Sequence, residues 1–424
     1  MPDGSSAPAA VRRPPAPSPR RSSRPPFDCI ALLLQCGGAL GSYQAGVYEA
    51  LADAGLHPDW VAGISIGAVN AAIIAGNAPD ERVAQLRTFW EEISANPLLD
   101  WALACDALVP KGDAARGLLN QISATWALFG GAPGFFAPRQ LFPWLHPAGT
   151  LEAIGGAPGF FAPRQLFPWL HPAGTLEATS WYETKHLKAT LERLVDFGRI
   201  NSGEMLFSVG AVNVRTGNLV CFDNTTHIIR PEHVMASGAL PPGFPPVEIE
   251  GEFYWDGGLI SNTPLQWVVE SAPRQDTLAF QVDLWSAQGD LPRNLAEVTT
   301  RQKEIQYSSR TRANTDQFKS VQRLRSALGS LLSKLPQDLR ETDEARLLSR
   351  EADQKAYNLV HLIYRARTYE GHSKDYEFSR LTMMEHWRAG RHDAVRTLRH
   401  PEVLERPDTP DGVFTFDLAR HGRE

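Results

Sequence analysis

Two glycine-rich turns near the start of the chain constrain its fold most strongly. The first glycine turn, residues 36–41 (CGGALG), follows the apolar run 30–34, and the serine turn, residues 63–67 (GISIG), follows residues 60–62. A continuous apolar run is typical of a strand that is buried on both faces of a parallel sheet. Each turn precedes a segment with helical spacing of apolar residues. Strand, turn and helix, repeated twice, predict an α/β layer fold.

Later segments extend the expected sheet and then change character. Short apolar or alternating runs predict strands over 205–214, 218–222, 247–254 and 276–285. After about residue 291 the sequence becomes charged and helical, without β-branched runs. We therefore expect an α/β domain over residues 27–290 and a helical extension over residues 291–424.

Composition excludes several classes of protein. The net charge of −6 argues against nucleic-acid binding, which usually requires a strongly basic domain. Four widely spaced cysteines without a Cys/His cluster exclude a zinc module and a disulfide scaffold. No uninterrupted run of 18 apolar residues is present, so we expect no membrane span. We expect a cytoplasmic protein that uses no metal and no cofactor.

Residues 1–26 differ from the rest of the chain. They contain eight prolines and five arginines and almost no large apolar side chains. Such a segment cannot bury enough surface to offset its ordering entropy, so we expect a disordered tail. It lacks the apolar core and cleavage site of a secretory signal. A solvated basic tail is the simplest interpretation, with anchoring to an acidic surface as the alternative.

The region 130–178 contains a tandem repeat. Residues 130–153 recur unchanged as residues 155–178. A solenoid needs at least three copies that can stack, so two identical, proline-rich copies indicate a recent duplication or an artefact of the sequence. We expect one copy to be dispensable, and we expect the aromatic, proline-rich segment to form an irregular flap near the functional site.

The serine turn is the strongest candidate for a catalytic element. Gly63 and Gly67 flank Ser65 at two positions on either side, which allows a sharp turn that projects the serine hydroxyl. The helix that follows directs its N-terminal N–H groups towards negative charge that develops beside the serine. The alternative is a glycine-rich packing turn in which the serine only caps the helix.

The first glycine turn is a candidate for binding an anion through its backbone. A P-loop would require a lysine before the serine at position 42, and a dinucleotide site would require an acidic residue after the second strand; both are absent. Backbone N–H groups of Gly37, Gly38, Ala39 and Gly41 could instead form an oxyanion hole for a tetrahedral intermediate.

Asp256, followed by Gly257 and Gly258, is the candidate partner of Ser65. The three residues follow an expected strand, and the alternative is an aspartate that only stabilises its own turn. A Ser-His-Asp hydrolase normally has several strands before its serine, whereas here one strand precedes Ser65. The histidines after Asp256 lie in charged sequence and read as solvated side chains: 361, 372, 386, 392 and 400. A two-residue Ser–Asp device therefore fits better.

In these motifs and their order, the chain resembles the patatin-like phospholipases. The resemblance covers about residues 27–285 and includes the segment 236–241 (ASGALP), which is similar to the family segment that leads to the aspartate. It implies a three-layer α/β/α fold with a mostly parallel sheet, Ser65 as the nucleophile and Asp256 as the proton acceptor. Two residues depart from the family pattern: Cys36 replaces a glycine, and Leu40 replaces a common basic residue.

The resemblance also implies the substrate class. It points to a lipid acyl hydrolase of the phospholipase A type that acts through an acyl-enzyme. The alternatives are a carboxylesterase for soluble or polyester-type substrates and a catalytically silent module that binds membranes or proteins. Leucines at helical spacing and basic residues over 319–335 make this segment a candidate for peripheral membrane contact. The simpler interpretation is that this leucine stripe packs on the α/β domain.

Overall fold

The computed structural model describes residues 24–95, 112–138, 168, 171–270, 273–367, 369–407 and 412–417. Most of the predicted disordered tail and the middle of the repeated region lie outside these residues, so both expectations stay predictions.

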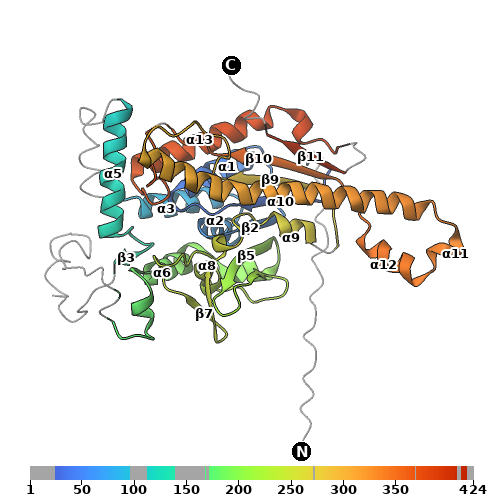
Figure 1. Ribbon diagram of the computed structural model, residues 1–424, viewed down its shortest axis with the longest axis horizontal. Coiled ribbons are helices and arrows are strands. Elements are labelled where there is room, and N and C mark those ends of the chain that lie inside the picture. The colour runs from blue at the N-terminus through green and yellow to red at the C-terminus, as the bar shows by residue number, and fades with distance from the viewer. Residues whose placement is uncertain are drawn as a thin grey trace, which may run out of the picture.

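A nine-stranded sheet forms the centre of the described part of the chain, in the order β11-β10-β9-β1-β2-β5-β8-β7, with β6 also paired to β5 (Figure 1). The strands from β11 to β5 in this order are parallel, whereas β6, β7 and β8 pair antiparallel. Their bounds are β1 Cys29–Leu34, β2 Trp60–Gly63, β5 Leu206–Asn213, β6 Leu219–Asp223, β7 Val247–Ile249, β8 Glu252–Asp256, β9 Thr277–Asp283, β10 Tyr357–Ile363 and β11 Val413–Phe416.

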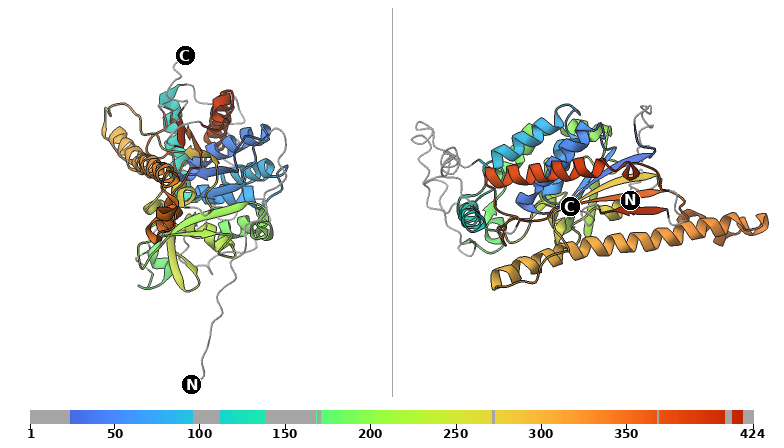
Figure 2. Two further views of the ribbon diagram at one scale, coloured as in Figure 1. Left: turned by 90° about the vertical axis from the view of Figure 1, so that its right-hand side faces the viewer. Right: turned by 90° about the horizontal axis from the view of Figure 1, so that it is seen from above.

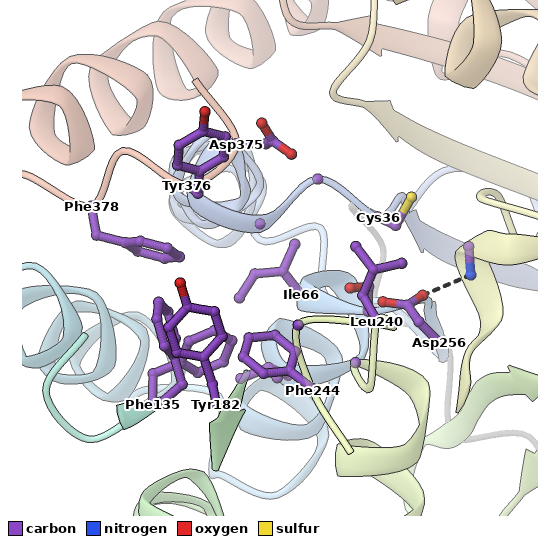
Figure 3. A pocket seen from close by; sticks show the side chains of 18 of the residues that line it. Cys36, Ile66, Phe135, Tyr182, Leu240, Phe244, Asp256, Asp375, Tyr376 and Phe378 are labelled. Atoms are coloured by element: carbon purple, nitrogen blue, oxygen red, sulfur yellow. Dashed lines mark hydrogen bonds between the residues drawn. The ribbon is translucent and has the colours of Figure 1, made fainter. Parts of the chain in front are cut away.

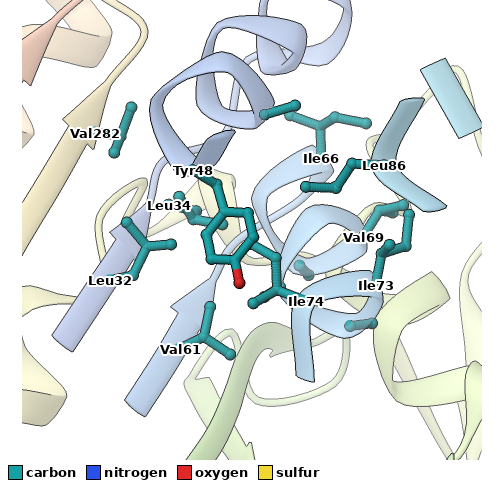
Figure 4. Packing of buried hydrophobic residues seen from close by; sticks show 14 of the residues in the cluster. Leu32, Leu34, Tyr48, Val61, Ile66, Val69, Ile73, Ile74, Leu86 and Val282 are labelled. Carbon is teal, nitrogen blue, oxygen red and sulfur yellow. The ribbon is translucent and has the colours of Figure 1, made fainter. Parts of the chain in front are cut away.

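Helices cover both faces of this sheet, as the two views in Figure 2 show. On one face lie α1 (Ser42–Asp53), α2 (Ile66–Ala75), α3 (Arg82–Ile93) and α13 (Arg380–Leu398); on the other lie α9 (Leu265–Glu270) and α10 (Leu295–Ser333). Side chains alternate along a strand, so β1 contributes to two cores. Leu32 and Leu34 pack with α1 and α2 (Figure 4), whereas Leu33 packs under α9 and α10. The predicted three-layer α/β/α fold is confirmed.

Smaller elements surround one end of the sheet. They are α5 (Asp113–Gly130), α6 (Lys185–Leu194), α7 (Phe197–Ser202), α8 (Pro231–Ser237) and the two-stranded pair β3 (Ala137–Pro138) and β4 (Tyr182–Glu183). The predicted strands of the α/β domain are confirmed as β1, β2 and β5 to β9. The hairpin between β7 and β8 turns at Glu250 and Gly251, which both have positive φ, as a tight hairpin turn requires.

The region after residue 291 is mainly helical, as predicted, but it also supplies two strands that were not predicted. β10 pairs with β9, so the C-terminal region extends the same sheet. Its helix α13 crosses α1 closely: a Cβ at Gly46 would lie 1.9 Å from the carbonyl oxygen of Trp387, and one at Gly390 would lie 2.0 Å from that of Tyr43. Backbones meet at this crossing because neither glycine carries a side chain.

One residue of α13 corrects an expectation from the sequence. His386 was expected to be solvated, but it is fully buried, and its Nε2 lies 3.3 Å from an oxygen of the buried Glu370 carboxylate. The His386 ring also packs on the ring of Tyr364, with centroids 4.9 Å apart, so this side chain is removed from water although the sequence around it is charged.

The distal end of α10 projects from the body of the molecule, together with α11 (Gln337–Arg340) and α12 (Asp343–Glu351) (Figure 1). The predicted leucine stripe lies here and is divided. Leu324 and Leu331 are 69% and 58% exposed, whereas Leu328 and Leu332 are half-buried. No helix of the described residues is both long and apolar enough to cross a membrane.

Candidate active site

The serine turn adopts the sharp conformation that its glycines predict. Ser65 has φ 59° and ψ −124°, a strained combination for a residue with a side chain. A Cβ at Gly63 would lie 2.1 Å from the carbonyl oxygen of Gly67, and a Cβ at Gly67 would lie 2.3 Å from that of Leu34. Both flanking positions therefore require glycine, and α2 begins at Ile66, directly after the serine.

Asp256 ends β8 and is buried, with 1% of its surface exposed. Its Oδ1 accepts a hydrogen bond of 2.7 Å from the backbone N–H of Gly258. Burial raises the pKa of Asp256 to about 7, although hydrogen bonds from the Ser65 side chain and from Gly258 oppose this rise. The structure therefore brings Ser65 and Asp256 together, although 191 positions separate them in the sequence (256 − 65).

The end of α8 and the residues directly after it hold Ser65 and Asp256 in place. The N–H of Ser65 donates to the Oγ of Ser237 at 3.0 Å, and the N–H of Asp256 donates to the carbonyl of Ala239 at 3.0 Å. The two acceptors, Ser237 and Ala239, belong to the segment 236–241, which resembles the family segment that leads to the aspartate. One short stretch of chain therefore fixes the backbone at both candidate catalytic residues.

The first glycine turn lies beside the serine turn, and its residues have different surroundings. Gly37 and Gly38 line the same pocket as Ser65, and neither N–H donates a hydrogen bond within the described part of the chain. The N–H of Ala39 instead donates to the carbonyl of Asp375 at 2.8 Å. The expectation that Ala39 contributes to an oxyanion hole is therefore corrected, because its donor is already used.

Two further positions in these motifs act through packing. Gly41 does not line the pocket but packs on Ile66 and Trp90. A Cβ at Gly41 would lie 2.6 Å from the Ile66 side chain and 2.9 Å from the Trp90 ring. Gly257 lies against strand β5, where a Cβ would meet the carbonyl of Gly210 at 2.5 Å. Both glycines allow close approach of neighbouring elements, and the expected place of Gly41 in an oxyanion hole is not supported.

A cavity of about 270 Å³ opens beside Ser65 and Asp256. Its wall is mostly apolar and aromatic, and Figure 3 shows the rings gathered at one end with Asp256 at the other. The aromatic wall consists of Phe135, Phe136, Tyr182, Phe244, Tyr376 and Phe378. Most of these rings contact one another at centroid distances of 5.0 to 6.1 Å. Such a wall suits an acyl chain rather than a polar ligand.

The polar groups of this cavity are few. Asp256 and Asp375 are the charged residues among its described lining, and no histidine is among them. His233, which precedes the aspartate in the sequence, is buried elsewhere: it packs on Phe222, and its Nδ1 accepts from the N–H of Arg230. No cluster of three or more potential metal ligands occurs in the described residues.

The fold and this site together define an α/β protein in which a strained serine turn lies beside a buried carboxylate at one end of an apolar cavity. The chain belongs to the patatin-like phospholipase family. The model of that family, described as Patatin-like phospholipase, matches residues 32–268, which is more than half of the chain. A second family model, described as Patatin phospholipase, matches residues 305–410 and so covers most of the C-terminal region.

Comparison with solved structures finds VipD from Legionella pneumophila among the similar chains. The TM-score is 0.36 and the sequence identity is 16%, over 92% of this chain and 72% of that chain. No curated protein matches the chain.

Several residues at this site were not predicted from the sequence. Phe135 and Phe136 belong to the repeated segment, and their place in the cavity wall agrees with the expected flap near the site. Trp285, Asp375 and Phe378 line the same cavity from the C-terminal side. Their sequence surroundings carry no motif, because their positions depend on contacts with residues more than 200 positions earlier.

Proposed function

We propose that the chain is a serine acyl hydrolase that cleaves carboxylic esters of lipids by means of Ser65 and Asp256. Family membership supports lipid acyl hydrolase activity in general. The observation that carries the specific proposal is the strained Ser65 hydrogen-bonded to a buried carboxylate whose pKa is raised to about 7. A carboxylate with an ordinary pKa of about 3.9 is a weak base, and burial makes Asp256 a stronger one.

The reaction follows from this geometry. The Oγ of Ser65 forms a bond to the ester carbonyl carbon while its proton passes to Asp256, and the carbonyl oxygen becomes an oxyanion. The N–H groups of Gly37 and Gly38 stabilise this charge, and the N-terminus of α2 adds to the positive potential. Asp256 then returns the proton to the leaving alcohol, and an acyl-enzyme remains. Water, deprotonated by Asp256, releases the fatty acid and restores the serine.

The decisive experiment compares Ser65→Ala and Asp256→Asn with the wild type on a panel of p-nitrophenyl esters, phospholipids and triacylglycerol. Each substitution is expected to lower kcat by about a thousandfold or more, and a fluorophosphonate probe should label the wild type but not Ser65→Ala. Histidines replaced one at a time serve as controls and should leave most of the rate. A single histidine replacement as damaging as Ser65→Ala would exclude the two-residue mechanism. Absence of both labelling and turnover in the wild type would indicate a catalytically silent module.

We also propose that the distal end of α10 contacts a lipid surface. The exposed Leu324 and Leu331 offer apolar area on a projecting helix, with Lys334 close by. The variant Leu324→Asp/Leu331→Asp should bind anionic vesicles less than the wild type in co-sedimentation, because it loses apolar area and gains negative charge. Because both side chains are exposed, the fold should persist. Equal binding by the folded variant would exclude this contact.

A further inference from the structure

The C-terminal region reaches the first glycine turn through a short connection between β10 and α13. We name residues 374–378 the brace segment. The carbonyl of Asp375 accepts the hydrogen bond from the N–H of Ala39, and a Cβ at Gly38 would lie 2.1 Å from that same oxygen. Gly38 also has φ +55°, a conformation that favours glycine. The brace segment therefore lies directly on the backbone whose N–H groups the proposed reaction uses.

Two ion pairs with consecutive residues of α10 fix the brace segment. The Nζ of Lys303 lies 2.6 Å from each carboxylate oxygen of Asp375, and the Nζ of Lys374 lies 2.5 Å from Oε1 of Glu304. The side chain of Lys374 is 3% exposed and that of Asp375 is 19% exposed. Ion pairs removed from water in this way are screened less by solvent than surface pairs. They therefore define the position of the segment along α10.

Trp285 connects the same cluster to the other end of the first glycine turn. Its indole N–H donates to the carbonyl of Cys36 at 3.1 Å, and its ring stacks on Tyr307 of α10 with centroids 5.0 Å apart. The ammonium groups of Lys303 and Lys374 lie 5.5 and 5.2 Å from the Trp285 ring centroid. Trp285 and the brace segment thus contact the first glycine turn at Cys36 and at Ala39, on both sides of Gly37 and Gly38.

From these contacts we infer that Lys303 is a positioning residue for the reaction, which acts through Asp375 and Ala39 on the N–H groups of Gly37 and Gly38. The inference rests on the proposed function. Donors that stabilise an oxyanion act mainly in the transition state, and their contribution depends on their direction. Loss of the Lys303–Asp375 ion pair leaves the N–H groups of Gly37 and Gly38 present but less well oriented. The expected signature is therefore a lower kcat with little change in KM, and the C-terminal region becomes a working part of the active site.

The test measures kcat, KM and the melting temperature for Lys303→Met on a short soluble ester. Arg312→Met is the matched control, because Arg312 is an exposed cation on the same helix and nine residues further along, on the opposite side. We expect kcat of Lys303→Met to fall roughly tenfold to a hundredfold, below the cost of removing an oxyanion donor outright. KM should stay within about twofold. Lys303→Arg should restore most of kcat, and Arg312→Met should match the wild type.

A second readout separates positioning from a general loss of structure. A trifluoromethyl ketone forms a charged tetrahedral adduct with a catalytic serine, whereas the corresponding methyl ketone competes for the site without such charge. Lys303→Met should raise the inhibition constant of the trifluoromethyl ketone by the same factor by which kcat falls. It should leave the inhibition constant of the methyl ketone unchanged. Equal weakening of both inhibitors would overturn the inference, as would a kcat within about twofold of the wild type.

Asp375→Asn keeps the proposal testable if Lys303→Met does not fold. This variant retains the carbonyl that binds Ala39 and loses only the charge that binds Lys303. We expect the same loss of kcat as in Lys303→Met. The double variant Lys303→Met/Asp375→Asn should have a kcat no lower than either single variant, because both substitutions break the same ion pair. Full activity of Asp375→Asn would overturn the inference. Ser65→Ala, measured alongside, distinguishes this failure from failure of the proposed function.

Discussion

The two glycine-rich turns resemble each other in sequence and in topology, but different parts of the chain hold them in place. Each connects a parallel strand to a helix, and β1 and β2 are neighbours in the sheet. The serine turn is held mainly by its immediate surroundings: Gly63 packs on Gly67, and Gly67 packs on the backbone of β1. The first glycine turn depends on Trp285 and Asp375, which belong to later parts of the chain.

This difference shows that a motif can be local in sequence while the structure that it needs is not. The glycines two positions before and after Ser65 allow its strained conformation, and the N–H of Ser65 also donates to Ser237 from outside the turn. The first glycine turn has an equally clear sequence pattern, yet the N–H of its Ala39 donates to the carbonyl of Asp375, which lies 336 positions later (375 − 39). Four predictions test how far the two turns differ.

The largest effect on folding is expected from alanine at Gly67. Its Cβ would lie 2.3 Å from the carbonyl of Leu34 in the centre of the sheet, where the backbone cannot move away. We expect Gly67→Ala to lower the free energy of unfolding by about 3 kcal/mol and to abolish activity. Gly38→Ala would bring its Cβ within 2.1 Å of the backbone carbonyl of Asp375 and would hold alanine at φ +55°, so it should also cost about 3 kcal/mol, here by displacing the C-terminal region and not the central sheet. Urea unfolding with ester kinetics measures both variants, and a Gly38→Ala protein as stable as the wild type would show that the first glycine turn does not depend on the brace segment.

The second prediction concerns pH, to which the two turns should respond differently. Asp256 must be ionised to act as a base, and its pKa is raised to about 7. We therefore expect kcat/KM to fall about tenfold per pH unit below 7 and to be constant above it. Backbone N–H groups do not titrate in this range, so Lys303→Met should lower the whole profile without moving its midpoint. A midpoint near 4 in the wild type would contradict the raised pKa of Asp256.

The same raised pKa has a consequence for stability. The folded protein keeps its proton on Asp256 up to about pH 7, whereas an unfolded chain releases it near the ordinary value of 3.8. Ionisation of Asp256 therefore destabilises the fold progressively as the pH rises from about 4 through 7. Asp256→Asn should accordingly melt at a higher temperature than the wild type at pH 8, and this advantage should disappear at pH 4.

The third prediction tests the hydrogen bond that reaches the serine turn from outside. Ser237→Ala removes the acceptor of the Ser65 N–H and leaves that partly buried donor without its partner. A cost of about 1.4 kcal/mol would correspond to about a tenfold lower kcat. Ser208→Ala is the control, because Ser208 is also buried and accepts from Trp60 away from the cavity. Equal loss of kcat in both variants would show that the effect is not specific to the serine turn.

The smallest effect is expected from removal of one repeat copy, which contacts neither turn in the described residues. Deletion of residues 154–178 gives the same sequence as deletion of 139–163, because the two copies are identical. The product therefore keeps Phe135 and Phe136 in the cavity wall and also the tail of the second copy, residues 171–178. We expect kcat/KM within about twofold of the wild type and a cooperative melt, because loop length costs little free energy. Insoluble expression would contradict the prediction that one copy is dispensable.

Much of the fold was predictable from the sequence because its signals are local. The glycines around Ser65 and the apolar runs of β1 and β2 identify strand, turn and helix over a few residues. By contrast, β10 is an apolar heptapeptide, YNLVHLI, in charged surroundings, and periodicity cannot distinguish such a short run from part of a helix. Its pairing with β9 makes it a strand. The buried His386 was missed for a similar reason, because its contacts with Tyr364 and Glu370 depend on the tertiary fold and leave no local pattern in the sequence.

The long separation between Gly38 and Asp375 also bears on how the protein is made. The ribosome adds 337 residues between these two positions (375 − 38). At roughly 5–20 residues per second, this takes on the order of 20–70 seconds. During that interval the serine turn and Asp256 can already be assembled in the nascent chain, while the first glycine turn still lacks its contact from Asp375. Synthesis from N- to C-terminus therefore completes the contacts of the first glycine turn last, when the brace segment has emerged.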